Sequence, residues 1–514
     1  MPAQFTHNSE QFVAKSVLES IRSPKPTPWA QSTGFTVGTY MTNLGRLFVC
    51  SVGGQSSPSG SGPNHSHGTG QDGGVTWVGL GAYTTSDSSP TGNLYMGFGR
   101  NNSAPWDDDE APPAPVDSDA YSAEILDNLV FALRIDPSDI TLGFDRNEWA
   151  PNTTYDQYDP NVATNNSIVY SSGNVYRCID NNGGAASTTP PSGTSAGFFL
   201  TADGYVWKYL GGIDAFSMFK FGTPSYIPVP NVVPNITPAN GTLSSFNSFE
   251  STAVPFDEDE EIVLTLVPDD GTGGSIAART TINANEKTIT GFYVQSAGSG
   301  YSRDTYAVAT SGLAVGSGAV AGDVEITSGE ITSIPVDTSG SDYTDATVII
   351  LGDGTGATAV TVVDSGSVSA INVTNGGSGY TWAKAIIIPG DKGAAARVTL
   401  GPEGGHGSNL ESEINGTVLL ISKSVSIGNI HIPSDSDTVD GSFRQISLLG
   451  GLVLSTRNAP ACIGKSHPDW DNPVQGTIKY QRGGTVLFTN NLEPIVHSTS
   501  QEEVVKIAMN IDRT

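Results

Sequence analysis

Three segments of the chain align without gaps: TITGFYVQSAGSGY (288–301), EITSIPVDTSGSDY (330–343) and SVSAINVTNGGSGY (367–380). Each segment leads into a second strand-like run and then into a stretch rich in glycine and alanine. The apolar residues of each unit, such as Ile331 and Ile334, fit strands with one buried face. A unit of about 40 residues cannot bury that face alone, so stacked units must share a core. The pattern therefore predicts a three-unit β-repeat domain over residues 271–400, inserted into a host domain.

A second motif occurs twice, with its parts in the same order. It consists of a strand with a cysteine, a glycine-rich loop, an Asp-Gly turn and a strand with a tryptophan. The copies read GRLFVCSVGG (45–54) with DGGVTWVGLG (72–81), and GNVYRCIDNNGG (173–184) with DGYVWKYLGG (203–212). They resemble small strand–loop–Trp modules that recur in phage tail proteins and in some chitin-binding modules. Trp77 and Trp207 either stack on a sugar or pack beneath their own hairpins, and we favour packing.

The rest of the sequence is also typical of β structure. Glycine accounts for 61 of the 514 residues, and short strand-like runs alternate with Gly, Pro, Asn and Asp. Only residues 9–22 and 118–134 show the apolar spacing of a helix. The sequence therefore predicts a mainly β fold with few helices.

These patterns also predict where the parts of the chain begin and end. The predicted parts are an N-terminal helical arm (1–30), a small inserted β module (31–84), the first part of a core domain with the Trp-bearing motif 173–212 (85–270), the inserted repeat domain (271–400) and the second part of the core (401–514).

The charge of the chain excludes several classes of partner. Asp and Glu number 52 and Lys and Arg 24, which gives a net charge of −28 at pH 7. Binding to nucleic acid or to an anionic membrane surface depends on an excess of Lys and Arg. No segment approaches the about 18 consecutive apolar residues of a membrane-spanning helix, and the N-terminus lacks a secretory pattern. We therefore expect no nucleic-acid partner and no membrane.

Two short motifs resemble parts of catalytic or nucleotide-binding sites. Residues 193–197 match the nucleophile-elbow pattern around Ser195, but a loop rich in Pro, Ser and Thr replaces the strand–turn–helix context that this pattern requires. Residues 464–466 match the end of a phosphate-binding loop, but Ala459 stands where its first glycine belongs. Neither motif predicts an enzyme.

Metal-ligating patterns are equally weak. His65 and His67 have no carboxylate or cysteine near enough to complete a site. The acidic runs 107–110 and 257–261 lack the spaced oxygens of a calcium loop, and the second run reads as a solvated entrance to a strand. The cysteines are odd in number and far apart, which argues against disulfides and against a cysteine metal site: they are Cys50, Cys178 and Cys462. We expect no catalytic residue, no metal and no cofactor.

Seven segments outside the repeats occur in the order of a known family. They are YMGFGRNNSAPWDDDEAPPAPVDS (95–118), RNEWAPNTTYDQYDP (146–160), GNVYRCID (173–180), DGYVWKYL (203–210), IPVP (227–230), GSFRQISLLG (441–450) and GGTVLFTNNLEPIVHSTSQEEVVKIAMNI (483–511). Together they resemble the baseplate wedge protein of contractile-tailed, T-even-like bacteriophages that forms a dimer at the wedge periphery. The module at 31–84 and the repeats at 271–400 are absent from the family pattern and look like insertions into this wedge core.

The resemblance implies a layered β-sandwich with a few helices in its loops, and a structural role without catalysis. It also implies a homodimer that joins other baseplate wedge proteins to fibre or fibre-adaptor proteins. Its place would be the virion tail baseplate, after synthesis in the host cytoplasm. An alternative function is a carbohydrate-binding tail fibre or adhesin, which the Trp-bearing motifs and the glycine-rich repeats would suit.

Four residues are candidates for contacts with partners. Arg100 precedes an acidic loop and suits a bidentate pair with a carboxylate. Trp106, Trp149 and Trp207 are large apolar anchors that suit either an interface or a core. For each of the four, a role in maintaining the fold is the favoured alternative.

Overall fold

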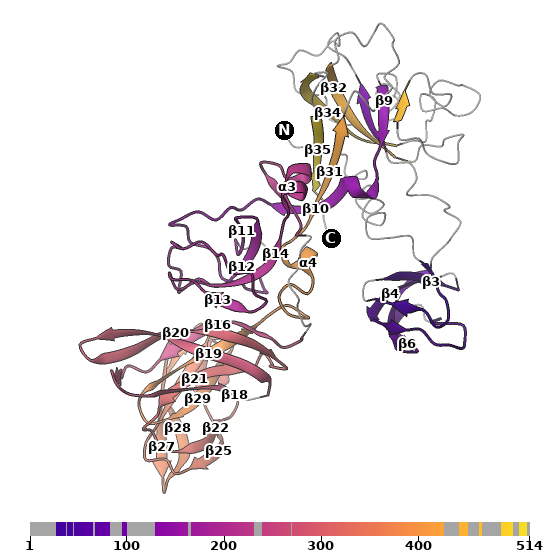
Figure 1. The fold of residues 1–514 in the computed structure, drawn as a ribbon. Coiled ribbons are helices and arrows are strands. Elements are labelled where there is room, and N and C mark those ends of the chain that lie inside the picture. The colour runs from indigo at the N-terminus through magenta and orange to yellow at the C-terminus, as the bar shows by residue number, and fades with distance from the viewer. Residues whose placement is uncertain are drawn as a thin grey trace. The chain divides into compact units, whose positions relative to one another are not determined.

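The protein is mainly β, as the sequence predicts. The computed structural model describes residues 27–36, 39–44, 46–64, 67–82, 95–99, 129–162, 166–230, 239–268, 270–425, 442–450, 462–464, 485–496 and 503–510 (Figure 1). Internal contacts divide the chain into two units, and each is treated by itself below. Unit 1 comprises Met1–Phe144, Phe219–Pro228 and Thr417–Thr514, and unit 2 comprises Asp145–Met218 and Val229–Gly416. The domain ranges given above stay a prediction.

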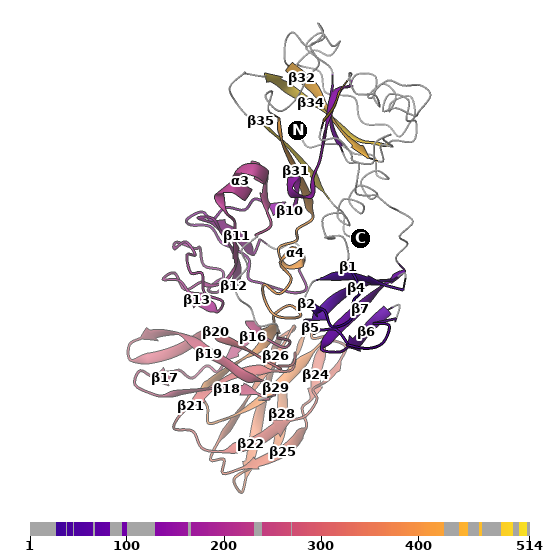
Figure 2. The same ribbon diagram turned by 45° about the vertical axis from the view of Figure 1, so that its right-hand side comes forward.

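The first sheet of unit 1 carries the first Trp-bearing motif; Figure 2 labels its strands β1, β4, β6 and β7, and Figure 1 labels β3. Its order is β1 (Thr27–Pro28), β3 (Tyr40–Asn43), β4 (Arg46–Val52), β7 (Val75–Ala82) and β6 (His67–Asp72), with a separate pair of β2 (Gly34–Phe35) and β5 (Gly54–Gln55). Its core contains Phe48, Cys50 and Trp77, all 1% exposed or less. β1 pairs with β3, so this sheet takes in residues from 27 onward.

Two further sheets of unit 1 combine strands from distant parts of the sequence. One has the order β33 (Cys462–Gly464), β9 (Leu129–Arg134), β8 (Tyr95–Gly99), β32 (Ser442–Gly450) and β34 (Thr485–Val496). The other has the order β15 (Tyr226–Pro228), β10 (Ile140–Asp145), β31 (Val418–Val425) and β35 (Glu503–Asn510), with the short helix η1 (Pro137–Asp139) before β10. β35 is the terminal strand, and it pairs with β31 over eight residues of each strand.

The helix predicted over residues 118–134 is wrong for residues 129–134, which form β9. Leu129, Val130 and Leu133 have the spacing of a helix, whereas Leu129, Phe131 and Leu133 have the alternation of a strand. Pairing within the sheet decides between the two. β9 lies between β8 and β33, and Phe131 stacks on Phe98 of β8 with ring centroids 4.8 Å apart. Residues 118–128 and the helix predicted over 9–22 lie outside the described residues.

Unit 2 contains the second Trp-bearing sheet. Its order is β11 (Ile168–Ser171), β12 (Asn174–Asp180), β14 (Val206–Gly212) and β13 (Phe198–Leu200). Helix α3 (Ala215–Phe221) follows along the chain, and the boundary between the units falls within it, after Met218. This sheet and the sheet of residues 27–82 use the same arrangement of four strands. In each, the Cys-bearing and Trp-bearing strands are central neighbours, and the strand before the Asp-Gly turn lies on the far side of the Trp-bearing strand.

The repeat region of unit 2 is a stack of β layers. The first layer is β17 (Phe256–Asp257), β20 (Glu286–Ser299) and β19 (Thr272–Asn283), and the second is β16 (Leu243–Ser251), β30 (Gly393–Leu400), β21 (Tyr306–Ser311) and β18 (Ile262–Val267). The pair β26 (Ala346–Gly352) and β29 (Ala383–Pro389) packs on the other face of the second layer. The remaining pairs are β22 (Ser317–Ala321) with β25 (Val336–Ser341), β23 (Glu325–Thr327) with β24 (Glu330–Ser333), and β27 (Thr355–Asp364) with β28 (Ser367–Ser378).

Side-chain alternation explains why the layers stack. Ala307 and Ala394 of the second layer face Phe292 of β20, where small side chains leave room for the ring. Val308, the residue after Ala307 on β21, faces the opposite way, toward Ile349 and the rest of the β26–β29 pair. Because successive residues of a strand point to opposite faces, the central strands β21 and β30 of the second layer are buried on both sides.

The three sequence repeats form three copies of one local structure. Tyr301, Tyr343 and Tyr380 are each 5–6% exposed. Each hydroxyl accepts a backbone N–H from the neighbouring strand: Gly274 at 3.1 Å, Ala319 at 3.2 Å and Ala357 at 3.4 Å. Each tyrosine thus ties the end of its repeat to the glycine-rich strand that pairs with it.

Candidate interaction site

The two Trp-bearing motifs have the same strand register. Cys50 pairs with Trp77 across β4 and β7, and Cys178 pairs with Trp207 across β12 and β14. A register shift follows the cysteine in both pairs of strands. The sequence similarity between the motifs therefore reflects two copies of one structural module.

Both of these tryptophans lie entirely within their own modules. Trp77 and Trp207 have no exposed surface, and the indole of Trp207 stacks on Tyr205 with ring centroids 5.4 Å apart. Tyr155 meets the same indole edge-on at 5.7 Å. An indole must expose a face to stack on a sugar, so the packed arrangement is confirmed for this structure. The glycan-binding alternative thus loses one of its two supports, the Trp-bearing motifs, while the glycine-rich repeats remain.

A second tryptophan of each module was not recognised as part of the motif. Trp29 donates from Nε1 to Asp72 Oδ2 at 2.7 Å, and Trp149 donates from Nε1 to Ser187 Oγ at 3.1 Å. Ser187 in turn donates to Asp203 Oδ2 at 2.9 Å. Both indoles are half-buried and bond, directly or through one hydroxyl, to the aspartate of the Asp-Gly turn. Both tryptophans are followed by alanine, at residues 29–30 and 149–150, and this shared pair is the sequence pattern that marks them as equivalent.

Asp203 is the polar centre of the second module. Its Oδ2 accepts the backbone N–H groups of Thr188 and Thr189 at 2.7 and 2.9 Å, and its Oδ1 accepts the Thr201 hydroxyl at 2.5 Å. Burial opposes ionisation, but these hydrogen bonds outweigh it and lower the pKa of Asp203 to about 2. The ionised carboxylate thus holds the loop before β13 against the Asp-Gly turn.

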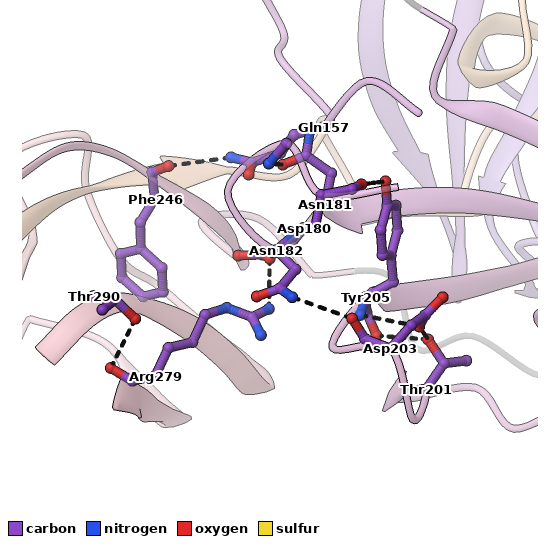
Figure 3. Close-up of polar contacts among 12 residues, drawn as sticks. Gln157, Asp180, Asn181, Asn182, Thr201, Asp203, Tyr205, Phe246, Arg279 and Thr290 are labelled. Atoms are coloured by element: carbon purple, nitrogen blue, oxygen red, sulfur yellow. Dashed lines mark hydrogen bonds and ion pairs between the residues drawn. The ribbon is translucent and has the colours of Figure 1, made fainter. Parts of the chain in front are cut away.

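The second module packs on the repeat region through polar contacts, shown in Figure 3. Arg279 of β19 reaches toward the module, and its Nη2 lies 2.5 Å from Asp180 Oδ1 at the end of β12. Gln157 donates from Nε2 to the backbone oxygen of Phe246 at 3.1 Å. Both charges of the ion pair are largely buried, with side chains 14% and 9% exposed. These contacts fix how the module sits on β16 and β19 within unit 2.

A buried polar network forms a second connection within unit 2, and sequence reasoning missed it. Arg177 of β12 lies with Nε 3.2 Å from Glu413 Oε1, at the end of helix α4 (Leu410–Glu413). Nδ1 of His406 lies 2.5 Å from the same oxygen, and Nε2 lies 2.8 Å from Ser244 Oγ on β16. The members are separated by up to 236 positions in sequence, so no local pattern could reveal them.

The protonation states in this network follow from burial. Burial lowers the pKa of His406, against the opposing effect of Glu413, so the ring is neutral. Burial alone would raise the pKa of Glu413, but His406 and Arg177 outweigh it and lower that pKa. A carboxylate only accepts hydrogen bonds, so Nδ1 of His406 carries the proton and Nε2 accepts from the Ser244 hydroxyl.

Ser244, His406 and Glu413 form a hydrogen-bonded chain of the kind that joins a nucleophile, its general base and an orienting acid in some enzymes. The surroundings suit a structural role instead. Ser244 has no exposed surface, so its hydroxyl lacks access to a substrate. Arg177, itself 5% exposed, already balances the charge of Glu413. The arrangement can bind β12, β16 and α4 together.

The other predicted site residues are dispersed. Arg100, Trp106, His65 and the acidic run 107–110 lie outside the described residues. Ser195 is exposed in a loop that enters strand β13 rather than a helix, so the nucleophile-elbow geometry is absent there. Of residues 464–466, only Gly464 is described, at the end of β33.

The acidic run 257–261 is only partly solvated, which corrects the expectation for one of its members. Glu260 is 8% exposed, and its Oε2 lies 2.8 Å from the Nζ atom of Lys392. Asp257, whose side chain is 79% exposed, lies 3.3 Å from the same ammonium. One carboxylate of the run therefore pairs internally while its neighbours face solvent.

Helix α3 carries two exposed aromatic rings. Phe216 is 70% exposed and Phe219 is 67% exposed, and their spacing of three residues places them on one face of the helix. Exposed aromatic residues of this kind are enriched at protein interfaces.

Comparisons with known proteins agree with the resemblance seen in the sequence. No family model matches the chain. The baseplate wedge protein gp8 of Enterobacteria phage T4 is 28% identical to it over 192 residues, which covers 29% of this chain and 57% of the phage T4 protein. No described helix is long and apolar enough to cross a membrane. Over part of its length, the chain is therefore similar to a phage baseplate wedge protein.

Proposed function

We propose that this protein is a structural subunit of a bacteriophage tail baseplate wedge. The observation that carries the proposal is the similarity to the phage T4 baseplate wedge protein. The ordered series of seven motifs in the sequence supports the same conclusion. A chain that is mainly β, with modules joined by buried ion pairs, suits a rigid building block.

At a finer level, the proposed subunit is a homodimer at the wedge periphery. It would join other wedge proteins to fibre or fibre-adaptor proteins and remain in the tail baseplate of the virion. The exposed rings of Phe216 and Phe219 on α3 are the described residues best suited to a protein contact, because burying aromatic side chains contributes strongly to interfaces.

The proposed subunit has no catalytic role. The Ser244–His406–Glu413 order is the one feature of the described residues that argues for an enzyme, and its serine is fully buried. We expect a fluorophosphonate probe to leave Ser244 unlabelled in the native protein. Labelling of Ser244 that His406→Ala abolishes would contradict this part of the proposal.

Cross-linking mass spectrometry of purified virions tests the assignment. We expect cross-links between this chain and other baseplate proteins, and density for it in a map of the tail end. Cross-links between this chain and capsid proteins measure the level of non-specific cross-linking. If the chain is present in infected-cell lysate but absent from particles, the proposal is wrong.

A further inference from the structure

A pocket of about 340 Å³ lies in unit 2, where the second Trp-bearing module meets the repeat region. Lys208 of β14 and Phe198 of β13 line one side, and Gln295 and Ser296 of β20 line another. Thr242 and His406 complete the polar lining. The volume is at the small end of the about 300–1,000 Å³ typical of ligand pockets, so it fits a single small molecule.

Lys208 is a buried cation without a carboxylate partner. The residue is 4% exposed, and its ammonium donates one hydrogen bond to the backbone oxygen of Ala196, another pocket residue. Within the described part of the chain, no carboxylate oxygen lies within 4.0 Å of Nζ. The Glu413 carboxylate acts on Lys208 only from beyond ion-pair distance. A buried charge is normally paired at close range. An ammonium has three donors and one is used by Ala196, so Lys208 has hydrogen bonds left for an anionic ligand.

Thr242 supplies a second unsatisfied group in the same pocket. It is 7% exposed, and its hydroxyl oxygen is buried without a hydrogen-bond partner among the described residues. Buried polar atoms are nearly always bonded to protein or to a bound molecule. Lys208 and Thr242 line the same pocket, so they are the two groups that a ligand with acceptor oxygens would satisfy.

The charges around the pocket limit the charge of the ligand. Arg177 and Glu413 form an ion pair and cancel, and His406 is neutral. Lys208 therefore leaves a single positive charge. A ligand with one negative charge balances it, whereas a phosphate dianion would bring an unbalanced charge close to Glu413.

We propose that this pocket binds the carboxylate of a small monoanionic molecule, with the Lys208 ammonium and the Thr242 hydroxyl as donors to its oxygens. The rings of Phe198 and His406, inclined at 64° with centroids 6.1 Å apart, provide a weakly polar aromatic wall for the body of the molecule. Gln295 and Ser296, both exposed, offer hydrogen bonds to its hydroxyl or amide groups. Ser296 Oγ does so as an acceptor, because it donates its own hydrogen to the backbone oxygen of Gly273 at 2.8 Å.

Isothermal titration of the full-length protein tests the proposal with glucuronate and N-acetylalanine as carboxylate probes. Glucose and inorganic phosphate serve as a neutral and a dianionic comparison. We expect at least one carboxylate probe to bind at least tenfold more tightly than glucose and than phosphate. Preference for glucuronate identifies a sugar acid as the ligand class, and preference for N-acetylalanine identifies a terminal peptide carboxylate.

Variants distinguish a loss of ligand binding from a loss of folding. Lys208→Met keeps the aliphatic stem and should weaken carboxylate binding at least tenfold without lowering the melting temperature. Thr242→Val should weaken it several-fold. Lys384→Met, on β29 outside the pocket lining, is the matched control and should bind like the wild type. Absence of binding by both carboxylate probes, equal binding of glucose, or unchanged affinity in Lys208→Met would overturn the proposal.

Discussion

At the scale of single residues, the tryptophans of this chain divide by burial. Trp207 has no exposed surface and packs between two tyrosines. We expect Trp207→Ala to lower the free energy of unfolding by about 3–5 kcal/mol, because it removes a large buried ring and leaves a cavity. Urea denaturation followed by circular dichroism measures the change. Leu200→Ala, at a side chain 52% exposed on β13, is the control and should cost far less.

The depressed pKa of Asp203 makes stability depend on pH in a defined direction. The carboxyl has a pKa of about 2 in the folded protein against 3.8 ordinarily, so the fold favours its ionised form. The stabilisation is complete above about pH 4 and is lost as the pH falls towards 2.

Asp203→Asn isolates this contribution, because the amide cannot ionise. We expect the variant to be less stable than the wild type at pH 7, and the gap between them to narrow from pH 5 to pH 2.5. Melting temperatures across this range provide the measurement. A gap that stays constant with pH would show that the charge of Asp203 does not stabilise the fold.

The buried Arg177–Glu413 pair should be sensitive to loss of one partner. Arg177→Met leaves the Glu413 carboxylate buried without its cation, and breaking such a pair typically costs about 3–5 kcal/mol. Denaturant unfolding measures the loss. The pair of Arg146 and Glu148 provides the contrast, because its side chains are 26% and 58% exposed. Arg146→Met should therefore cost less than Arg177→Met, by about 2 kcal/mol or more.

At the scale of elements, the repeated tyrosines predict equal effects at three places. Replacing Tyr301, Tyr343 or Tyr380 with Phe removes one hydrogen bond to a backbone N–H and keeps the ring. Each change should lower the free energy of unfolding by about 1 kcal/mol. Similar losses at all three sites in denaturant unfolding would support the structural equivalence of the repeats, and a loss at only one would contradict it.

Sequence patterns predicted elements well where local spacing and pairing agreed. The repeats and the Trp-bearing hairpins show this, because their turns and their strand alternation lie within short segments. The segment Leu129–Arg134 shows the limit, since its spacing fits a helix and a strand equally and only its neighbours β8 and β33 decide. The network of Arg177, His406 and Glu413 could not be predicted from sequence patterns, because its members are far apart in sequence and only the folded structure brings them together.

At the scale of the whole molecule, exposed aromatic rings on α3 test the proposed dimer. Phe216 and Phe219 remain 70% and 67% exposed in the single chain. We expect Phe216→Ser with Phe219→Ser to shift the protein from dimer to monomer in light scattering coupled to size-exclusion chromatography. Leu313→Ser, at a side chain 79% exposed in the repeat region, should leave the dimer intact. A wild-type monomer at all concentrations would refute the dimer itself.

The duplicated Trp-bearing module has a consequence for how such a chain evolves. Each copy contains its own core and its own Trp–Asp anchor, so it carries the information for its fold within one short stretch of gene. A stretch of that kind can be copied within a gene or transferred between genes as a unit. Once two copies exist, the loops before β6 and β13 are free to diverge, and natural selection can change one surface of the protein while the framework stays the same.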